Sequence, residues 1–125
     1  MAQRTLIAIV DDDDSMRQAL TALLSSFGYT VADFESAAHF LSSDRRQSTA
    51  CLIADVQMPV MTGLELHSRL IAAGDPIPVV FITAHPDPII QSRAVRGGAK
   101  GFLIKPFSQD DLLSCLNSAL SSASP

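Results

Sequence analysis

Reactive and charged side chains stand directly after four short apolar runs of this sequence. They are Asp11 and Asp12, then Asp55, Thr83 and Lys105. Two like charges 4 Å apart repel by about 4 kcal/mol at an effective dielectric near 20, so carboxylates gathered in one place require a cation. Hard oxygen ligands that leave positions open for water or phosphate suit Mg²⁺ better than zinc. The residue types therefore predict a magnesium site, provided that the fold brings these segments together.

The apolar runs themselves are the elements expected to position these groups. They alternate with segments of helical period along the whole chain, which is typical of a parallel sheet wrapped by helices. We expect strands at 6–10, 29–34, 50–54, 78–82 and 101–104. The first run is apolar on both faces, as a central parallel strand should be, whereas the second includes Asp33 and fits a more exposed position.

The intervening segments carry apolar residues at helical spacing and residues that cap helices. The first helix has Met16, Leu20, Leu23, Leu24 and Phe27 on one face and ends at Gly28, where a left-handed cap is expected. Asp13 or Asp14 is a candidate N-cap. The other predicted helices run from Ser36 to about 41, from a capping box at 62–65 to Gly74, from Asp87 and Pro88 to about Gly97, and from Ser108 to about 120. Residues 42–49 are expected to form a surface connection.

Five units of strand plus helix restrict the topology. Right-handed crossovers leave few arrangements, and the leading one is a doubly wound α/β sheet of strand order 2-1-3-4-5. In such sheets a ligand binds beyond the carboxyl ends of the strands, where the strand order reverses. We therefore expect the carboxylates, the Thr83 hydroxyl and the Lys105 ammonium to meet at one edge of the sheet.

Length and composition exclude several classes of protein. A chain of 125 residues has room for one domain, which we expect at 1–120, with 121–125 as a tail or the start of a linker. A net charge of -4 and a pI near 5.1 argue against direct binding of nucleic acid. No signal sequence opens the chain and no apolar run approaches the ~18 residues of a membrane span, so the expected location is cytoplasmic.

The cysteines and histidines show no spacing typical of metal ligands. Cys51 and Cys115 have apolar neighbours and are expected to be buried, reduced thiols. His39 and His67 are expected on helix surfaces. His85 differs from both because it follows Thr83 by two residues and so falls beside the predicted site.

Four segments resemble the signature blocks of response-regulator receiver domains. They are Val10-Asp11-Asp12, Asp55-Val56-Gln57-Met58-Pro59 with Gly63 following, Ile82-Thr83-Ala84, and Lys105-Pro106-Phe107. The blocks occur in the order of the family, and the match covers essentially the whole chain. Segments 55–66 and 80–85 are most similar to receivers of FixJ-type transcription regulators.

The resemblance implies that Asp55 is a phosphoacceptor, and the chemistry agrees. A carboxylate at the end of a rigid strand can attack phosphorus to give an acyl phosphate. By the same resemblance Asp12 would bind Mg²⁺ directly and Asp11 mainly through metal-bound water. Asp55 itself and the backbone carbonyl of Gln57 would complete the protein ligands.

The remaining residues of the set would act on the phosphoryl group or respond to it. Lys105 would pair with Asp55 at rest and with a phosphoryl oxygen afterwards, and the family has a cis bond between this lysine and the proline that follows. Thr83 would donate a hydrogen bond to another phosphoryl oxygen. Phe102 occupies the place of the aromatic residue whose rotamer reports phosphorylation, and Ala84 lies in the same switch region.

Two side chains are candidates for setting how long the acyl phosphate lasts. Gln57 and His85 each stand two residues past a residue of the site, where their side chains would border the phosphoryl pocket and control access of the attacking water. Pro86 departs from the pattern of similar receivers, which commonly have glycine there. Proline restricts the backbone of a loop that is expected to move on activation.

Together these roles predict a receiver of a two-component phosphorelay rather than a conventional enzyme. It would take a phosphoryl group from a sensor histidine kinase and assist both its own phosphorylation and its autodephosphorylation. The face made by the fourth helix, fifth strand and fifth helix would then switch to control an output partner or domain, expected to be transcriptional. The same face is a candidate homodimer interface.

Other functions fit the sequence less well. A pseudo-receiver that binds partners without phosphorylation is the main alternative; the complete set of Asp11, Asp12, Asp55, Thr83 and Lys105 counts against it, and a phosphodonor assay would decide. A haloacid-dehalogenase-like phosphatase needs a second acid where Gln57 stands, and a longer chain for its cap. A flavodoxin-like FMN carrier would need a hydroxyl-rich phosphate loop where this chain has four aspartates.

Overall fold

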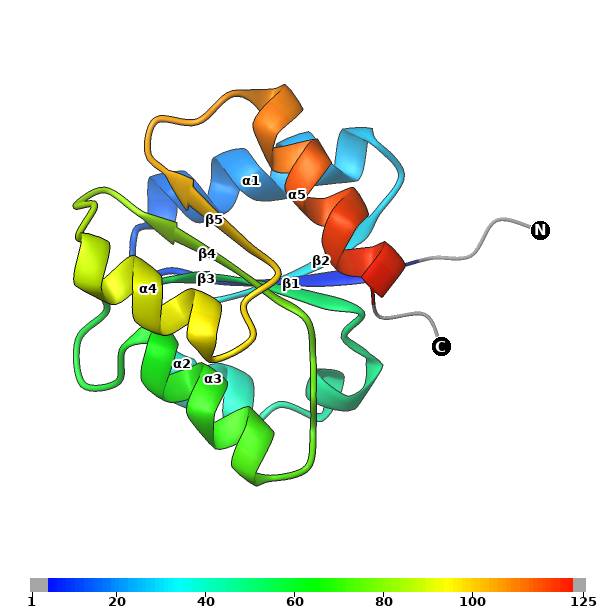
Figure 1. Ribbon diagram of the computed structural model, residues 1–125. Helices are drawn as coiled ribbons and strands as arrows, with labels where there is room; N and C mark the ends of the chain where they lie inside the picture. The colour runs from blue at the N-terminus through cyan, green and yellow to red at the C-terminus, as the bar shows by residue number, and fades with distance from the viewer. Residues whose placement is uncertain (1–4, 123–125) are drawn as a thin grey trace.

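A computed structural model describes residues 5–122 and contains one five-stranded parallel sheet flanked by helices (Figure 1). Its strands are β1 Leu6–Val10, β2 Thr30–Phe34, β3 Cys51–Asp55, β4 Val79–Thr83 and β5 Gly101–Ile104. Their order is β2-β1-β3-β4-β5, which confirms the predicted doubly wound α/β fold. The ladder of β4 starts one residue later than predicted because Pro78 has no N–H to contribute, although its carbonyl accepts a hydrogen bond from the N–H of Leu52.

Helix boundaries follow the capping residues of the sequence. The helices are α1 Asp14–Ser26, α2 Ala37–Leu41, α3 Gly63–Ala72, α4 Pro88–Arg96 and α5 Gln109–Ser122. Asp13 is confirmed as the N-cap of α1, because its carboxylate accepts hydrogen bonds from the N–H groups of Ser15 and Met16. The capping box at Thr62 and Glu65 is also confirmed. Asp87, followed by Pro88, caps α4 as predicted.

Two segments differ from expectation. The predicted surface connection contains a short 3₁₀ helix, η1, at Asp44–Ser48, which begins where the Ser43 hydroxyl accepts a hydrogen bond from the N–H of Arg45. Helix α5 runs to Ser122, two residues past its predicted end near 120. The rest of the predicted tail, 123–125, lies outside the described residues. Among residues 5–122, no helix has both the length and the apolar character needed to cross a membrane.

Two layers of helix cover the sheet and bury its central strands completely. Helices α1 and α5 pack on one face, and α2, α3 and α4 lie on the other (Figure 1). Every residue of β1, β3 and β4 is buried. Full burial of a Leu or Ile side chain stabilises a fold by about 1.5–3 kcal/mol relative to exposure. The strands that lead to Asp11, Asp55 and Thr83 are therefore anchored in the core on both faces, whereas β5, which leads to Lys105, is only partly buried.

Three side chains lie elsewhere than predicted. His67 is buried rather than on a helix surface, because it shares with Leu70 the face of α3 that packs on the sheet; its ring meets Phe81 edge-on with centroids 5.6 Å apart. Burial lowers the pKa of His67. Phe27 is exposed because it follows the last turn of α1. Cys51 is buried as predicted, and burial raises the pKa of its thiol to about 12, whereas Cys115 is only half-buried.

Candidate functional site

The register of the sheet brings the predicted residues to one edge. Val10 of β1 is opposite Ala54 of β3, so Asp11 and Asp55 come next on neighbouring strands. On β4 and β5, Thr83 is opposite Ile104, so Lys105 follows directly. All these groups stand at the carboxyl ends of parallel strands, where the strand order reverses between β1 and β3.

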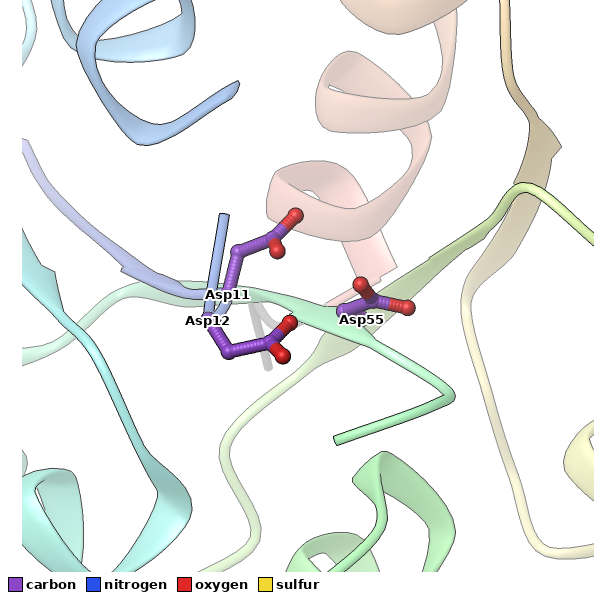
Figure 2. A group of neighbouring side chains, drawn as sticks. All are labelled: Asp11, Asp12 and Asp55. Carbon is purple, nitrogen blue, oxygen red and sulfur yellow. The ribbon is translucent and has the colours of Figure 1, made fainter. Parts of the chain in front are cut away.

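Three carboxylates form an acidic cluster at this edge. Asp11, Asp12 and Asp55 each offer one oxygen, and the three oxygens lie within 4.8 Å of one another. Figure 2 shows the carboxylates of Asp11 and Asp12 extending toward the side on which Asp55 lies. Ligands on opposite sides of an octahedral Mg²⁺ ion would be about 4.2 Å apart, given metal–oxygen distances of about 2.1 Å. The hard oxygen donors therefore suit a magnesium ion, and a slight closure of the cluster from its 4.8 Å limit would bring all three oxygens within reach of one ion.

The three carboxylates differ in their environment. Asp11 is fully buried and Asp55 is 6% exposed, whereas Asp12 is exposed. One oxygen of Asp11 accepts a hydrogen bond from the N–H of Asp13 at 2.9 Å. The Oδ1 atom of Asp55 accepts one from the N–H of Gln57 at 3.0 Å. Among the described residues the Asp12 carboxylate has no hydrogen-bond partner, so it is the one most available to a cation.

Lys105 is shared between two of these carboxylates. Its Nζ atom lies 3.1 Å from Oδ2 of Asp11 and 3.4 Å from Oδ2 of Asp55. The sequence predicted the contact with Asp55 and missed the closer one with Asp11. Burial alone would lower the pKa of Lys105, but the two carboxylates outweigh burial and raise it. The ammonium is therefore charged and partly balances the acidic cluster. The bond to Pro106 is cis, as the resemblance implied.

Asp55 is a carboxylate in an unfavourable environment. Its pKa is raised to about 6, chiefly by burial and further by the neighbouring charge of Asp11, while the hydrogen bond from Gln57 and the charge of Lys105 act in the opposite direction. The group is mostly ionised at neutral pH, and it is less well solvated than a surface carboxylate. A poorly solvated carboxylate beside a cation site is suited to nucleophilic attack.

The Thr83 hydroxyl is buried and engaged within its own loop. Its Oγ1 accepts a hydrogen bond from the N–H of His85 at 3.1 Å and donates to the carbonyl of His85 at 3.3 Å. Ala84 and His85 are exposed. A bond from Thr83 to a phosphoryl oxygen stays a prediction, and it requires this hydroxyl to leave the His85 carbonyl.

The predicted reporter residue Phe102 belongs to a row of rings. It is half-buried, and its ring centroid lies 6.5 Å from that of Phe81, which in turn packs against His67. The row runs from β5 across β4 to α3. The sequence interpretation marked Phe102 and missed His67, although a signal was present: His67 falls with Leu66 and Leu70 at the spacing of one helix face.

The loop between β3 and α3 is drawn tightly against the predicted phosphoacceptor. A Cβ atom on Gly63 would lie 2.4 Å from the backbone oxygen of Asp55, so only glycine fits there. Within this loop Val60 has a positive φ of 71° and its side chain is fully exposed. The left-handed region costs an L-residue about 1–2 kcal/mol, and a β-branched side chain is poorly suited to it.

We expect Val60→Asn to raise the free energy of unfolding by about 1 kcal/mol, because asparagine tolerates the left-handed region and no buried contact is lost. Urea unfolding followed by circular dichroism measures the change. The control is Val95→Asn, another exposed valine but with helical backbone, in α4, where valine and asparagine have similar helix propensity and stability should hardly change. If both variants change the free energy of unfolding by the same amount, strain in the backbone of Val60 is not the cause.

The structure also places one residue at the site that the sequence interpretation missed. Arg17 donates from Nη1 to the backbone carbonyl of Asp11 at 2.6 Å. A weak signal was available, because Arg17 follows Asp14 by three residues, the spacing of an ion pair on a helix surface. The contact with the carbonyl, however, depends on the turn from β1 into α1 and could not be read from spacing.

Comparison with known proteins agrees with this geometry. A family model for the response regulator receiver domain matches residues 7–117. The response regulator protein TmoT of Ectopseudomonas mendocina is 41% identical over 118 residues, which cover 94% of this chain and 54% of TmoT. The transcriptional regulatory protein FixJ of Bradyrhizobium diazoefficiens is 38% identical over 125 residues, which cover 100% of this chain and 61% of FixJ. The structure of the response regulator StyR superposes with a TM-score of 0.89 at 41% identity, covering 97% of this chain and 61% of StyR. The chain thus spans little more than half the length of these relatives.

Proposed function

This chain belongs to the response regulator receiver domain family, and from that premise we propose that it accepts a phosphoryl group on Asp55 in a Mg²⁺-dependent reaction. The observation that carries the proposal is the meeting of Asp11, Asp12, Asp55 and Lys105 at one edge of the sheet. The proposed phosphodonor is a phosphohistidine of a sensor histidine kinase. The proposed output is transcriptional, because the relative FixJ is named as a transcriptional regulatory protein.

In the proposed transfer, an oxygen of Asp55 forms a bond to phosphorus while the bond between phosphorus and the donor histidine nitrogen breaks. The freed imidazole nitrogen keeps the electron pair of that bond and takes up a proton. Asp11, Asp12, Asp55 and the backbone carbonyl of Gln57 would hold Mg²⁺, which when bound neutralises charge on the phosphoryl oxygens. The Lys105 ammonium, 3.4 Å from Asp55, can follow the negative charge onto a phosphoryl oxygen.

The proposed switch links the modified Asp55 to an exposed face. Thr83 would move its hydroxyl from the His85 carbonyl to a phosphoryl oxygen, and Phe102 on the neighbouring strand would change its rotamer. The face made by α4, β5 and α5 would carry the change to an output domain or a second copy of the chain. Its apolar side chains include the exposed Ile89, Val95 and Ile104, which are available to a partner.

A phosphodonor assay tests the proposal without any kinase. Acetyl phosphate with Mg²⁺ should raise the intact mass by about one phosphoryl unit, and hydroxylamine should remove the adduct as it does from an acyl phosphate. Binding of BeF₃⁻ with Mg²⁺, a stable mimic of the phosphoryl group, separates lack of reaction from rapid hydrolysis. If neither the adduct nor BeF₃⁻ binding is seen, the pseudo-receiver hypothesis replaces this one.

We expect His85 and Gln57 to set the lifetime of the acyl phosphate. Both side chains are exposed beside the site, where they would control the approach of the attacking water. Alanine at either residue should change the dephosphorylation rate severalfold and leave the Mg²⁺ affinity nearly unaltered. Loss of phosphoprotein with time, followed by intact mass, gives the rate. His39→Ala, an exposed histidine on α2, serves as the control, and lifetimes equal to that of this control would contradict the assignment.

A further inference from the structure

Arg17 connects three chain segments beside the acidic cluster. Its guanidinium donates from Nη1 to the backbone carbonyl of Asp11 at 2.6 Å and from Nε to the carboxylate of Asp33, at the end of β2, at 3.2 Å. Its Nη2 atom pairs with Asp14 in the first turn of α1. Although arginine is usually solvated, this side chain is only 12% exposed. The end of β1, the start of α1 and the end of β2 thus meet at one planar group.

The carbonyl that Arg17 holds belongs to the peptide unit that joins Asp11 to Asp12. Asp11 has further anchors, since its N–H donates to the carbonyl of Phe34 and its carboxylate contacts Lys105. The carboxylate of Asp12, by contrast, has no hydrogen-bond partner among the described residues. Its direction in Figure 2 therefore depends on its backbone, which two bonds hold: the one from Arg17 to the Asp11 carbonyl and the one from the N–H of Asp13 to the Asp11 carboxylate.

We propose that Arg17 is a positioning residue for the magnesium site, which it serves by holding the peptide between Asp11 and Asp12. The inference rests on the proposed function, because it presupposes that these carboxylates bind Mg²⁺. The guanidinium touches no proposed metal ligand atom. It acts on the backbone from which the exposed ligand Asp12 extends.

The charge of Arg17 and its positioning role have opposite effects on Mg²⁺ affinity. A positive charge near the cluster repels a cation, so its removal should tighten Mg²⁺ binding if charge alone matters. Loss of the bond to the Asp11 carbonyl should weaken binding, because Asp12 is then no longer held in place. Groups that orient metal ligands typically contribute about 10-fold to 100-fold in metal affinity. The sign of the change therefore separates the two effects.

The experiment measures Mg²⁺ affinity of the full chain by isothermal titration calorimetry, since the protein has no tryptophan to serve as a fluorescent probe. Arg17→Gln removes the charge and the planar fork of donors, while Arg17→Lys keeps the charge and removes only the fork. Arg45→Gln is the matched control: it also removes one positive charge, at an exposed arginine of η1, before β3 and away from the site. Circular dichroism of each metal-free variant shows whether it is folded.

We expect both Arg17 variants to bind Mg²⁺ about tenfold more weakly than wild type, with Arg45→Gln unchanged. Unchanged or tighter binding by folded Arg17→Lys would overturn the inference, even if that variant melts at a lower temperature, because a purely structural role would alter stability alone. If Arg17→Gln does not fold, the charge-conserving lysine variant decides. Failure of wild type to bind Mg²⁺ would instead refute the proposed function on which the inference rests.

Discussion

Asp55→Asn is expected to abolish labelling by acetyl phosphate in the presence of Mg²⁺. The amide that replaces the carboxylate has no oxygen able to form a stable acyl phosphate, and the other carboxylates of the cluster are poorly placed as acceptors. Asp11 is fully buried and holds the closer contact to Lys105, and Asp12 is the proposed direct metal ligand. Intact mass spectrometry of wild type and variant under identical conditions measures the difference.

Loss of labelling must be separated from loss of folding, and the raised pKa of Asp55 makes this possible. Because its pKa in the folded protein is about 6, above the usual value, ionisation of Asp55 opposes folding as the pH rises through about 6. A neutral asparagine removes that penalty. In metal-free buffer at pH 7 the variant should be more stable than wild type by roughly 1–3 kcal/mol, as measured by urea unfolding. A stable variant that still gains one phosphoryl unit would show that another residue is the acceptor.

Asp12→Ala is expected to weaken Mg²⁺ binding by at least about 100-fold, or roughly 2.7 kcal/mol. Asp12 offers an exposed carboxylate within reach of the oxygens of Asp11 and Asp55, and it is the member of the cluster that no hydrogen bond occupies. Removal of a direct ligand should exceed the 10-fold to 100-fold effects of groups that only orient ligands. Titration calorimetry of wild type and variant gives the ratio.

The control for this variant must remove the same charge without removing the ligand. Asp13→Asn does so at the adjacent residue, and asparagine is as good an N-cap as aspartate, so α1 should keep its start. We expect that variant to bind Mg²⁺ within a few-fold of wild type. If the two variants lose affinity equally, the cluster attracts the cation only through its net charge, and Asp12 is not a specific ligand.

Most of the fold could be predicted because its signals are local. The central strands are apolar on both faces, and caps such as Asp13, Thr62 and Asp87 mark helix starts through bonds to residues two or three positions away. The placement of the candidate site at one edge then followed from the rule that parallel strands share a carboxyl end. That rule brings Asp11, Asp55 and Lys105 together without knowledge of a single side-chain contact.

The features that could not be predicted depend on how segments approach one another. The closer contact of Lys105 with Asp11 depends on the path of the chain after β5, and the contact of Arg17 with a carbonyl depends on the turn before α1. The left-handed backbone of Val60 contradicts its own conformational preference, so no local rule could indicate it.

The contacts of Lys105 join residues that are 94 and 50 positions apart in the chain. An unfolded chain holds these groups far apart, so a ligand of the acidic edge would bind the native state and hardly the unfolded one. At a free concentration 100 times its Kd, such a ligand stabilises the native state by about 2.7 kcal/mol. The melting temperature of this domain would then rise with Mg²⁺ concentration. A substitution that opens a cavity in the core, far from Asp12, would lower the apparent metal affinity by reducing the population of the native state.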